Sequence, residues 1–189
     1  GKTGAIHVDF SQRASAEEIY AVGDCSEVYH RISKRWVHLP LGDVANKQGR
    51  VAGRNIGGIP MVFPGVVGAQ SFKIFNLEVA AAGLDEKEAA AAGYNPVSIV
   101  SWGNAIAGPL PEAKKLGMKL VADRSSGKLL GAQAIGEMGA VGRINTLSCA
   151  LWSAMDLDEI AYLDLAYSPF FGGAWDIIHT AAQALKKML

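Results

Sequence analysis

The stretch MKLVADRSSGKLLGAQAI, residues 118–135, carries the clearest folding signal in this chain of 189 residues. Its two apolar-rich halves, 118–124 and 128–135, are separated by a Ser-Ser-Gly sequence at 125–127. Glycine adopts a positive φ without a steric penalty from a Cβ, so this sequence is typical of a tight turn. The stretch therefore predicts two antiparallel strands joined as a β-hairpin.

The sequence on both sides of the hairpin predicts further strands and helices. The expected strands are 69–75, 77–82 and 97–102, and the expected helices are 85–92, 140–155, 157–162 and 175–189. Asp85 and Asp156 are expected to cap two of these helices, because an Asp side chain accepts hydrogen bonds from free N–H groups at a helix start. The order does not follow the βαβ period of a parallel sheet. The sequence thus predicts the α+β class, an antiparallel sheet with flanking helices.

The first third of the chain has a different pattern. Residues 19–24, IYAVGD, are predicted to form a strand ending in Gly-Asp, which would present a carboxylate where a nucleotide cofactor can lie. A helix is expected from Gly42 to about residue 56, followed by two glycines that would end it. A Pro-Gly pair further on indicates a boundary, so we expect two domains, 1–64 and 65–189.

The composition argues against several classes of function. Eighteen basic and eighteen acidic side chains cancel and are interspersed, so no binding surface for nucleic acid or an anionic membrane is expected. The uncharged runs 57–72 and 93–111 are interrupted by Pro and Gly, which argues against membrane spans. The chain starts with Gly1 and has no signal-peptide pattern. We therefore expect an internal or C-terminal piece of a longer, cytoplasmic protein.

The two cysteines, Cys25 and Cys149, stand far apart and outside any Cys-x-x-Cys pattern. Such cysteines are typical of small buried side chains in a reduced compartment. Neither a metal site nor a redox dithiol is expected from them.

Several motifs together resemble the FAD/NAD(P)-dependent disulfide reductase superfamily. Residues 3–24 resemble its last flavin-contacting segment, and 128–136, KLLGAQAIG, resembles a segment of its dimerisation domain. The tail at 164–176, DLAYSPFF followed by WD, resembles the branch of CoA-disulfide reductases, NADH oxidases and NAD(P)H sulfur or polysulfide reductases. The resemblance spans nearly the whole chain. It implies that 1–64 is the terminal strand and helix of a FAD-binding domain and that 65–189 is a dimerisation domain.

The resemblance also implies a set of cofactor-binding residues. Asp24 would accept hydrogen bonds from the ribityl hydroxyls of FAD, and Gly23 would let the backbone approach the cofactor closely. Leu41 and Gly42 would lie beside the flavin ring, where the positive end of a helix stabilises negative charge. Asp43, the expected helix cap, would compete for the same N–H groups. The alternatives from the residues alone are a turn Asp at 24 and an ordinary surface helix.

Tyr167 is the catalytic candidate, because its phenol donates or accepts a hydrogen bond. The resemblance implies that it reaches the partner subunit's flavin and thiol site, where it would orient substrate or protonate a leaving thiolate. The alternative is a core aromatic beside a Pro turn. Trp175, His179 and Lys47 are candidate substrate contacts, with Trp175 and His179 expected on one face of the last helix. A packing His and a solvated Lys are the alternatives.

The function implied by the resemblance is that of the C-terminal portion of a flavin-dependent NAD(P)H oxidoreductase, acting as a homodimer. Hydride would pass from NAD(P)H to the flavin and on to a cysteine-based acceptor, a disulfide or polysulfide, or to oxygen. No Gly-x-Gly-x-x-Gly motif is present, and neither cysteine stands in the family's redox context. NAD(P)H and the redox cysteine are therefore expected in upstream sequence, and this fragment alone is expected to be inactive.

Two departures from the family pattern argue against particular mechanisms and substrates. His179 is followed five residues later by Ala184, where glutathione-reductase-type enzymes have a Glu, so a His-Glu base dyad is not expected. The segment 104–111 has no tyrosine, which argues against specificity for CoA disulfide. The alternative from another class is a dimerisation or interaction module with no direct catalytic role.

Overall fold

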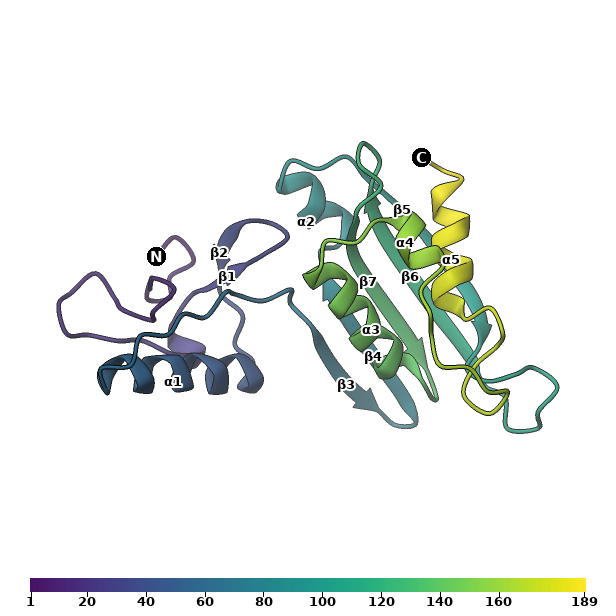
Figure 1. Cartoon of the computed structure of the whole chain (residues 1–189), viewed down its shortest axis with the longest axis horizontal. Helices are drawn as coiled ribbons and strands as arrows, with labels where there is room; N and C mark the ends of the chain where they lie inside the picture. Colours follow the sequence, from purple (N-terminus) through teal and green to yellow (C-terminus); the bar gives the residue numbers. More distant parts are fainter. The chain divides into compact units, whose positions relative to one another are not determined.

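The computed structural model describes all 189 residues, which form two compact units, Gly1–Val66 and Val67–Leu189. Figure 1 shows the helices and strands of each unit along the chain. The first unit contains little regular structure besides one helix, and the second contains the sheet predicted from the hairpin.

The first unit is organised around a single helix. Its elements are the 3₁₀ turn η1 (Gly23–Cys25), the strands β1 (Val28–His30) and β2 (Arg35–Val37), which pair antiparallel, and the helix α1 (Gly42–Ile56). The buried apolar side chains of its core are Val28, Val44, Val51, Phe63 and Val66. The predicted helix at 42–56 is confirmed, because its apolar residues recur on one face and can cover this core.

The strand predicted at 19–24 is wrong. This segment contacts the preceding chain through a single isolated bridge between Arg13 and Tyr20, and the Gly-Asp pair lies in η1. Gln12 and Glu18 have φ values of 69° and 60°, in the left-handed region that no strand uses. The chain facing the segment therefore bends away, and a continuous ladder of hydrogen bonds cannot form.

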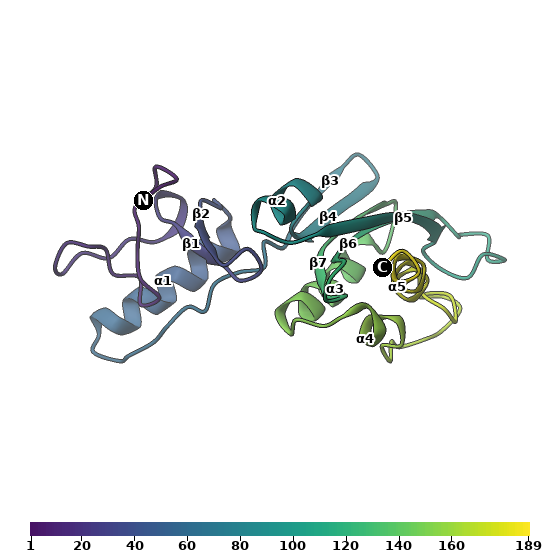
Figure 2. The same ribbon diagram turned by 90° about the horizontal axis from the view of Figure 1, so that it is seen from above.

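The second unit confirms the predicted α+β fold. Its strands are β3 (Gln70–Ile74), β4 (Leu77–Gly83), β5 (Pro96–Asn104), β6 (Lys115–Asp123) and β7 (Leu129–Gly136). They form one antiparallel sheet in the order β3-β4-β7-β6-β5. Figure 2 shows α3, α4 and α5 on one face of this sheet and α2 on the other.

The predicted hairpin is the pair β6–β7, in which Leu120 faces Ala132. Its turn is stabilised by Asp123, whose carboxylate accepts hydrogen bonds from the backbone N–H and the hydroxyl of Ser126, the latter at 2.7 Å. Burial raises the pKa of Asp123, but these hydrogen bonds outweigh it and hold the pKa below its ordinary value. Gly127 has a φ of 70°, as the turn sequence predicts.

The helices of the second unit are α2 (Glu86–Ala91), α3 (Ala140–Trp152), α4 (Leu157–Ala161) and α5 (Ile177–Lys186). Asp85 and Asp156 cap α2 and α4 as predicted, each in a reciprocal capping box with a Glu three residues on. The helix expected at 140–155 ends at Trp152, because Ala154 adopts a φ of 54°. None of the helices has both the length and the apolar character that crossing a bilayer requires.

The expectation that both cysteines are buried is wrong, since Cys25 and Cys149 are exposed. Cys25 lies on η1, which has no buried residue. Cys149 lies on the side of α3 away from Ile144 and Leu147, the residues that pack into the core. Apolar character alone did not indicate which face of each element points inward.

Candidate functional site

Gly23 and Asp24 lie on η1, against the first half of α1. Gly23 has a φ of 75°, and a Cβ on it would lie only 3.3 Å from the Cβ of Ala45 on α1. Its backbone N–H donates a hydrogen bond of 2.8 Å to Oε1 of Gln48. Glycine is therefore needed here both for the backbone conformation and for the close approach to α1.

Gln48 is a residue of this site that the sequence reasoning missed. Its side chain is buried, its Oε1 also accepts from the Ser26 hydroxyl, and its Nε2 donates to the carbonyl of Glu27. These bonds satisfy a buried amide and attach η1 to α1. A signal was present, because Gln48 stands on the face of α1 that Val44 and Val51 bury.

The Asp24 carboxylate is exposed and forms no hydrogen bond or ion pair within the chain. The residue is held through its backbone, since its carbonyl oxygen lies 2.8 Å from Nε2 of His38. An ionised carboxylate is an acceptor only, with room for several donors. Asp24 therefore presents an unused acceptor beside α1.

The start of α1 has no side-chain cap. Leu41 occupies the N-cap position without capping, and the prediction that Asp43 caps the helix is wrong. The Asp43 carboxylate instead pairs with Nζ of Lys47, one turn on, at 2.7 Å. The first N–H groups of α1 are thus left without a side-chain acceptor, at the positive end of the helix.

The four predicted cofactor-binding residues therefore lie around the first turns of one helix. Gly23 contacts Ala45, and the N–H of Ala45 donates to the carbonyl of Leu41 at 3.0 Å. Gly42 is the first residue of α1. Together with Asp24, these groups provide a carboxylate acceptor and free backbone donors, a combination suited to a ligand that carries both hydrogen-bond donors and acceptors.

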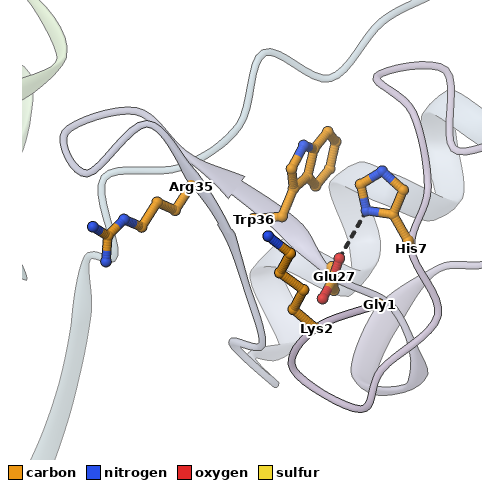
Figure 3. A pocket seen from close by; sticks show the side chains of 6 residues that line it. All are labelled: Gly1, Lys2, His7, Glu27, Arg35 and Trp36. Carbon is orange, nitrogen blue, oxygen red and sulfur yellow. Dashed lines mark hydrogen bonds and ion pairs between the residues drawn. The ribbon is translucent and has the colours of Figure 1, made fainter. Parts of the chain in front are cut away.

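A second polar cluster in the first unit lies apart from the predicted residues. Glu27 is buried, and its carboxylate accepts hydrogen bonds from Thr3 and, at 2.8 Å, from Nδ1 of His7. Burial alone would raise the pKa of Glu27, but these hydrogen bonds lower it to about 2. His7 and Glu27 line a pocket of about 750 Å³ together with Trp36, and Figure 3 shows His7 directed at the carboxylate. The sequence reasoning did not identify this cluster.

In the second unit, Tyr167 lies in the connection between α4 and α5. Its side chain is 59% exposed and its hydroxyl has no hydrogen-bond partner within the chain. Four more exposed aromatic side chains stand in the same connection, namely Tyr162, Phe170, Phe171 and Trp175. Exposure excludes the alternative of a core aromatic within this chain, and leaves the phenol free to bind another molecule.

Trp175 and His179 contact each other, but Trp175 lies before α5, whose cap is Asp176. The His179 ring is buried, and both its nitrogens are used: Nδ1 accepts from the Asp176 N–H, and Nε2 lies 2.9 Å from the carbonyl of Leu163. Trp175 is exposed and lines a pocket of about 420 Å³ with Asn104. The polar groups of His179 and Lys47 have partners within the chain, whereas Trp175 is exposed and contacts the rings of Tyr162 and His179.

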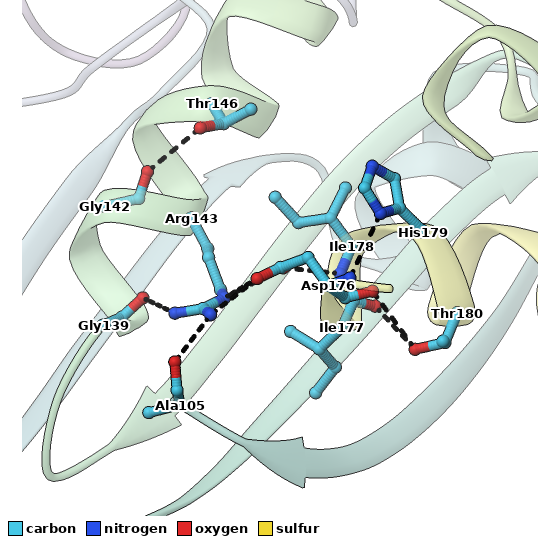
Figure 4. A network of polar contacts seen from close by, with 10 residues as sticks. All are labelled: Ala105, Gly139, Gly142, Arg143, Thr146, Asp176, Ile177, Ile178, His179 and Thr180. Carbon is cyan, nitrogen blue, oxygen red and sulfur yellow. Dashed lines mark hydrogen bonds and ion pairs between the residues drawn. The ribbon is translucent and has the colours of Figure 1, made fainter. Parts of the chain in front are cut away.

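Figure 4 shows a buried ion pair that joins α3 to the start of α5. The Arg143 guanidinium contacts Asp176 through Nε to Oδ1 at 3.0 Å and Nη2 to Oδ2 at 2.6 Å. Nη2 also donates to the carbonyl of Ala105 at 2.9 Å. The sequence reasoning missed this pair, although Arg143 is the only charged residue of α3.

Comparison with known proteins finds relatives whose similarity extends over both units. Residues 69–183 match the family described as pyridine nucleotide-disulphide oxidoreductase, dimerisation domain. The NAD(P)H sulfur oxidoreductase (CoA-dependent) of Pyrococcus furiosus is 35% identical over 186 residues, 98% of this chain and 42% of the relative. An NADH oxidase of Methanocaldococcus jannaschii is 33% identical over 188 residues, 97% of this chain and 41% of the relative.

Among solved structures, a NAD-dependent persulfide reductase from A. fulgidus superposes with a TM-score of 0.95 at 40% identity, over 100% of this chain and 35% of that one. The chain thus spans less than half the length of the curated relatives it matches. The family match covers more than half of the chain and includes every strand of the five-stranded sheet. The chain therefore belongs to the pyridine nucleotide-disulphide oxidoreductase family, with that family's dimerisation domain at residues 69–183.

Proposed function

We propose that this chain is the C-terminal part of a FAD-dependent NAD(P)H oxidoreductase whose acceptor is a disulfide, a polysulfide or oxygen. One observation carries the proposal. The similarity to a NAD(P)H sulfur oxidoreductase extends over 98% of the chain, so it includes Gly1–Val66 as well as the dimerisation domain. In this proposal the first unit is the end of a FAD-binding domain.

The residues of the first unit fit a flavin. The Asp24 carboxylate has no partner in the chain, so it is available to the ribityl hydroxyls, and Gly23 keeps the backbone beside it free of a side chain. The uncapped helix start at Leu41 and Gly42 offers N–H groups to the electron-rich edge of the ring. When bound, FAD would accept a hydride from NAD(P)H and pass electrons to the acceptor.

In the second unit we propose that Tyr167 serves the thiol site of the partner subunit in a homodimer. Its exposed hydroxyl, which has no partner in the chain, supports this role. The phenol would hold a proton near the sulfur atom of the acceptor and orient it. Trp175 is the remaining candidate for a substrate contact in this unit, since the ring nitrogens of His179 are engaged in the chain.

The test uses the full-length protein. We expect it to be yellow when purified and to oxidise NADH or NADPH with oxygen under air, or with CoA disulfide or polysulfide without oxygen. The upstream sequence should contain two Gly-rich dinucleotide motifs and one isolated cysteine. A colourless protein that takes up no added FAD rejects the proposal, as does an upstream sequence without these motifs.

The second candidate function is a dimerisation module with no contact to the reacting atoms, which the name of the matched family favours for residues 69–183. Tyr167→Phe in the full-length protein separates the two. The enzyme proposal expects slower acceptor reduction with flavin still bound and the dimer intact. The module proposal expects unchanged turnover.

A further inference from the structure

We propose that Arg143 and Asp176 are positioning residues that hold the Tyr167 segment, residues 163–176, in the geometry its proposed role requires. The inference rests on the proposed function of Tyr167 and goes beyond it, because neither residue contacts the phenol. The Tyr167 segment joins α4 to α5 and contains no regular secondary structure. Tyr167 has no side-chain hydrogen bond of its own in the chain, so the path of this segment sets where its hydroxyl lies.

The two ends of the Tyr167 segment are both attached to buried groups. At the first end, the Leu163 carbonyl lies 2.9 Å from Nε2 of the buried His179. At the other end, the Asp176 carboxylate accepts hydrogen bonds from Nε and Nη2 of Arg143. It also caps α5 by accepting a hydrogen bond from the N–H of Ile178. His179 and Asp176 are themselves linked, since the Asp176 N–H donates to Nδ1 of His179 at 3.1 Å.

The middle of the segment is attached to the loop after β5. The N–H of Ala107 donates to the Pro169 carbonyl at 2.9 Å, two residues from Tyr167. Arg143 anchors the same loop, because its Nη2 donates to the Ala105 carbonyl at 2.9 Å. One guanidinium therefore holds both the end of the Tyr167 segment and the loop that supports its centre.

The ion pair between Arg143 and Asp176 is largely buried. The side chains of Arg143 and Asp176 are only 10% and 13% exposed. Buried ion pairs of this kind often contribute little net stability compared with apolar residues of the same size. What a guanidinium supplies that an apolar side chain cannot is a planar fork of donors with fixed directions. The geometry points to positioning as the main role of the pair.

The experiment uses the full-length, flavin-bound protein and the acceptor that supports its turnover. Asp176→Asn keeps an oxygen that can cap α5, but it removes the negative charge that forms the ion pair with Arg143. We expect kcat to fall on the order of tenfold to a hundredfold, with a smaller change in KM and flavin still bound. Arg143→Lys, which keeps the charge without the fork, is expected to give a loss of similar size, because one ammonium cannot hold both Asp176 and the Ala105 carbonyl in the same geometry. Asp158→Asn, which removes the exposed ion pair with Lys186, is the matched control and should leave kcat unchanged.

A double-mutant cycle shows whether the pair acts through the phenol. In a Tyr167→Phe background, Asp176→Asn should cause little further loss of kcat, because the group being positioned is gone. The same fold-loss in both backgrounds would overturn the proposal.

Hydrogen exchange provides a readout independent of activity. Amides of the Tyr167 segment should exchange faster in Asp176→Asn, with no change at η1 and α1. Unchanged exchange in the segment overturns the positioning role. If Tyr167→Phe alone leaves turnover unchanged, the proposed role of Tyr167 fails, and faster exchange would still establish that the pair orders the segment.

Discussion

At residue scale, two carboxylates of the first unit are in opposite situations. Asp24 is exposed and unpartnered, whereas Glu27 is buried and receives hydrogen bonds from Thr3 and His7. The Asp24 carboxylate is available to a ligand, whereas the hydrogen bonds of the Glu27 carboxylate stabilise the fold. The contrast leads to separate predictions for binding and for stability.

Asp24→Ala in the full-length protein should weaken FAD retention. Loss of a charged acceptor costs about 1.5–3 kcal/mol, which corresponds to a dissociation constant raised roughly tenfold to a hundredfold. Flavin content after dialysis and titration of the apoprotein with FAD measure the effect. Glu17→Ala, which removes another exposed carboxylate of the same unit, should leave FAD binding unchanged. Equal retention in both variants would contradict the assignment of Asp24.

Glu27 should make stability depend on acid pH. Its pKa is lowered in the fold from 4.5 to about 2, so the folded state binds the proton less well than the unfolded state. The stabilisation is therefore present above pH 4.5, declines as the pH falls below this value, and is gone below about pH 2. Urea unfolding should show Glu27→Gln much less stable than wild type at neutral pH, with the difference shrinking as pH falls. A difference that stays constant down to pH 3 would contradict this prediction.

At the scale of elements, the sheet requires glycine where two chain segments come into contact. A Cβ on Gly131 of β7 would collide with the backbone of Leu84, just after β4. Gly131 pairs with Gly83, which has a φ of 80°. These glycines allow the end of β4 to turn tightly over β7, and any side chain at 131 must push the strands apart.

Gly131→Ala should therefore lower the free energy of unfolding by roughly 1–3 kcal/mol. Gly142→Ala is the matched control, because a Cβ there meets nothing within 4 Å and the residue lies in α3. Alanine is the better helix former, so the control should be neutral or slightly stabilising. Thermal unfolding of both variants measures the difference. Similar melting temperatures for the two variants would contradict the predicted collision at residue 131.

At the scale of the whole molecule, the second unit exposes many large apolar side chains. They include Phe72, Val100, Trp102, Tyr167, Phe170 and Phe171. Apolar surface of this extent is favourable to bury, and the unit belongs to a family of dimerisation domains.

We therefore expect the full-length protein to be a homodimer at micromolar concentration. Sedimentation velocity or light scattering should give twice the mass of one chain. A monomer at these concentrations would remove the route by which Tyr167 is proposed to reach a partner subunit.

The elements that the sequence predicted correctly are specified by interactions between residues close together in the chain. The β6–β7 hairpin follows from its turn, and the starts of α2 and α4 follow from Asp85 and Asp156, whose partners lie three residues away. The strand expected at 19–24 did not form, because a strand needs a partner segment that runs alongside it. Its immediate sequence does not specify one.

The sequence by itself determined the α+β class, the helix at α1 and the turn chemistry, because these depend on hydrogen bonds and apolar spacing within a few residues. Only the tertiary structure decided that Gln48 accepts a hydrogen bond from Gly23 and that Arg143 forms an ion pair with Asp176, 33 residues away. Only the fold, likewise, placed the Asp24 carboxylate and the Tyr167 hydroxyl at the surface without partners. Such contacts depend on how finished elements pack, and directional polar groups far apart in the chain carry no periodic signal that reveals their pairing.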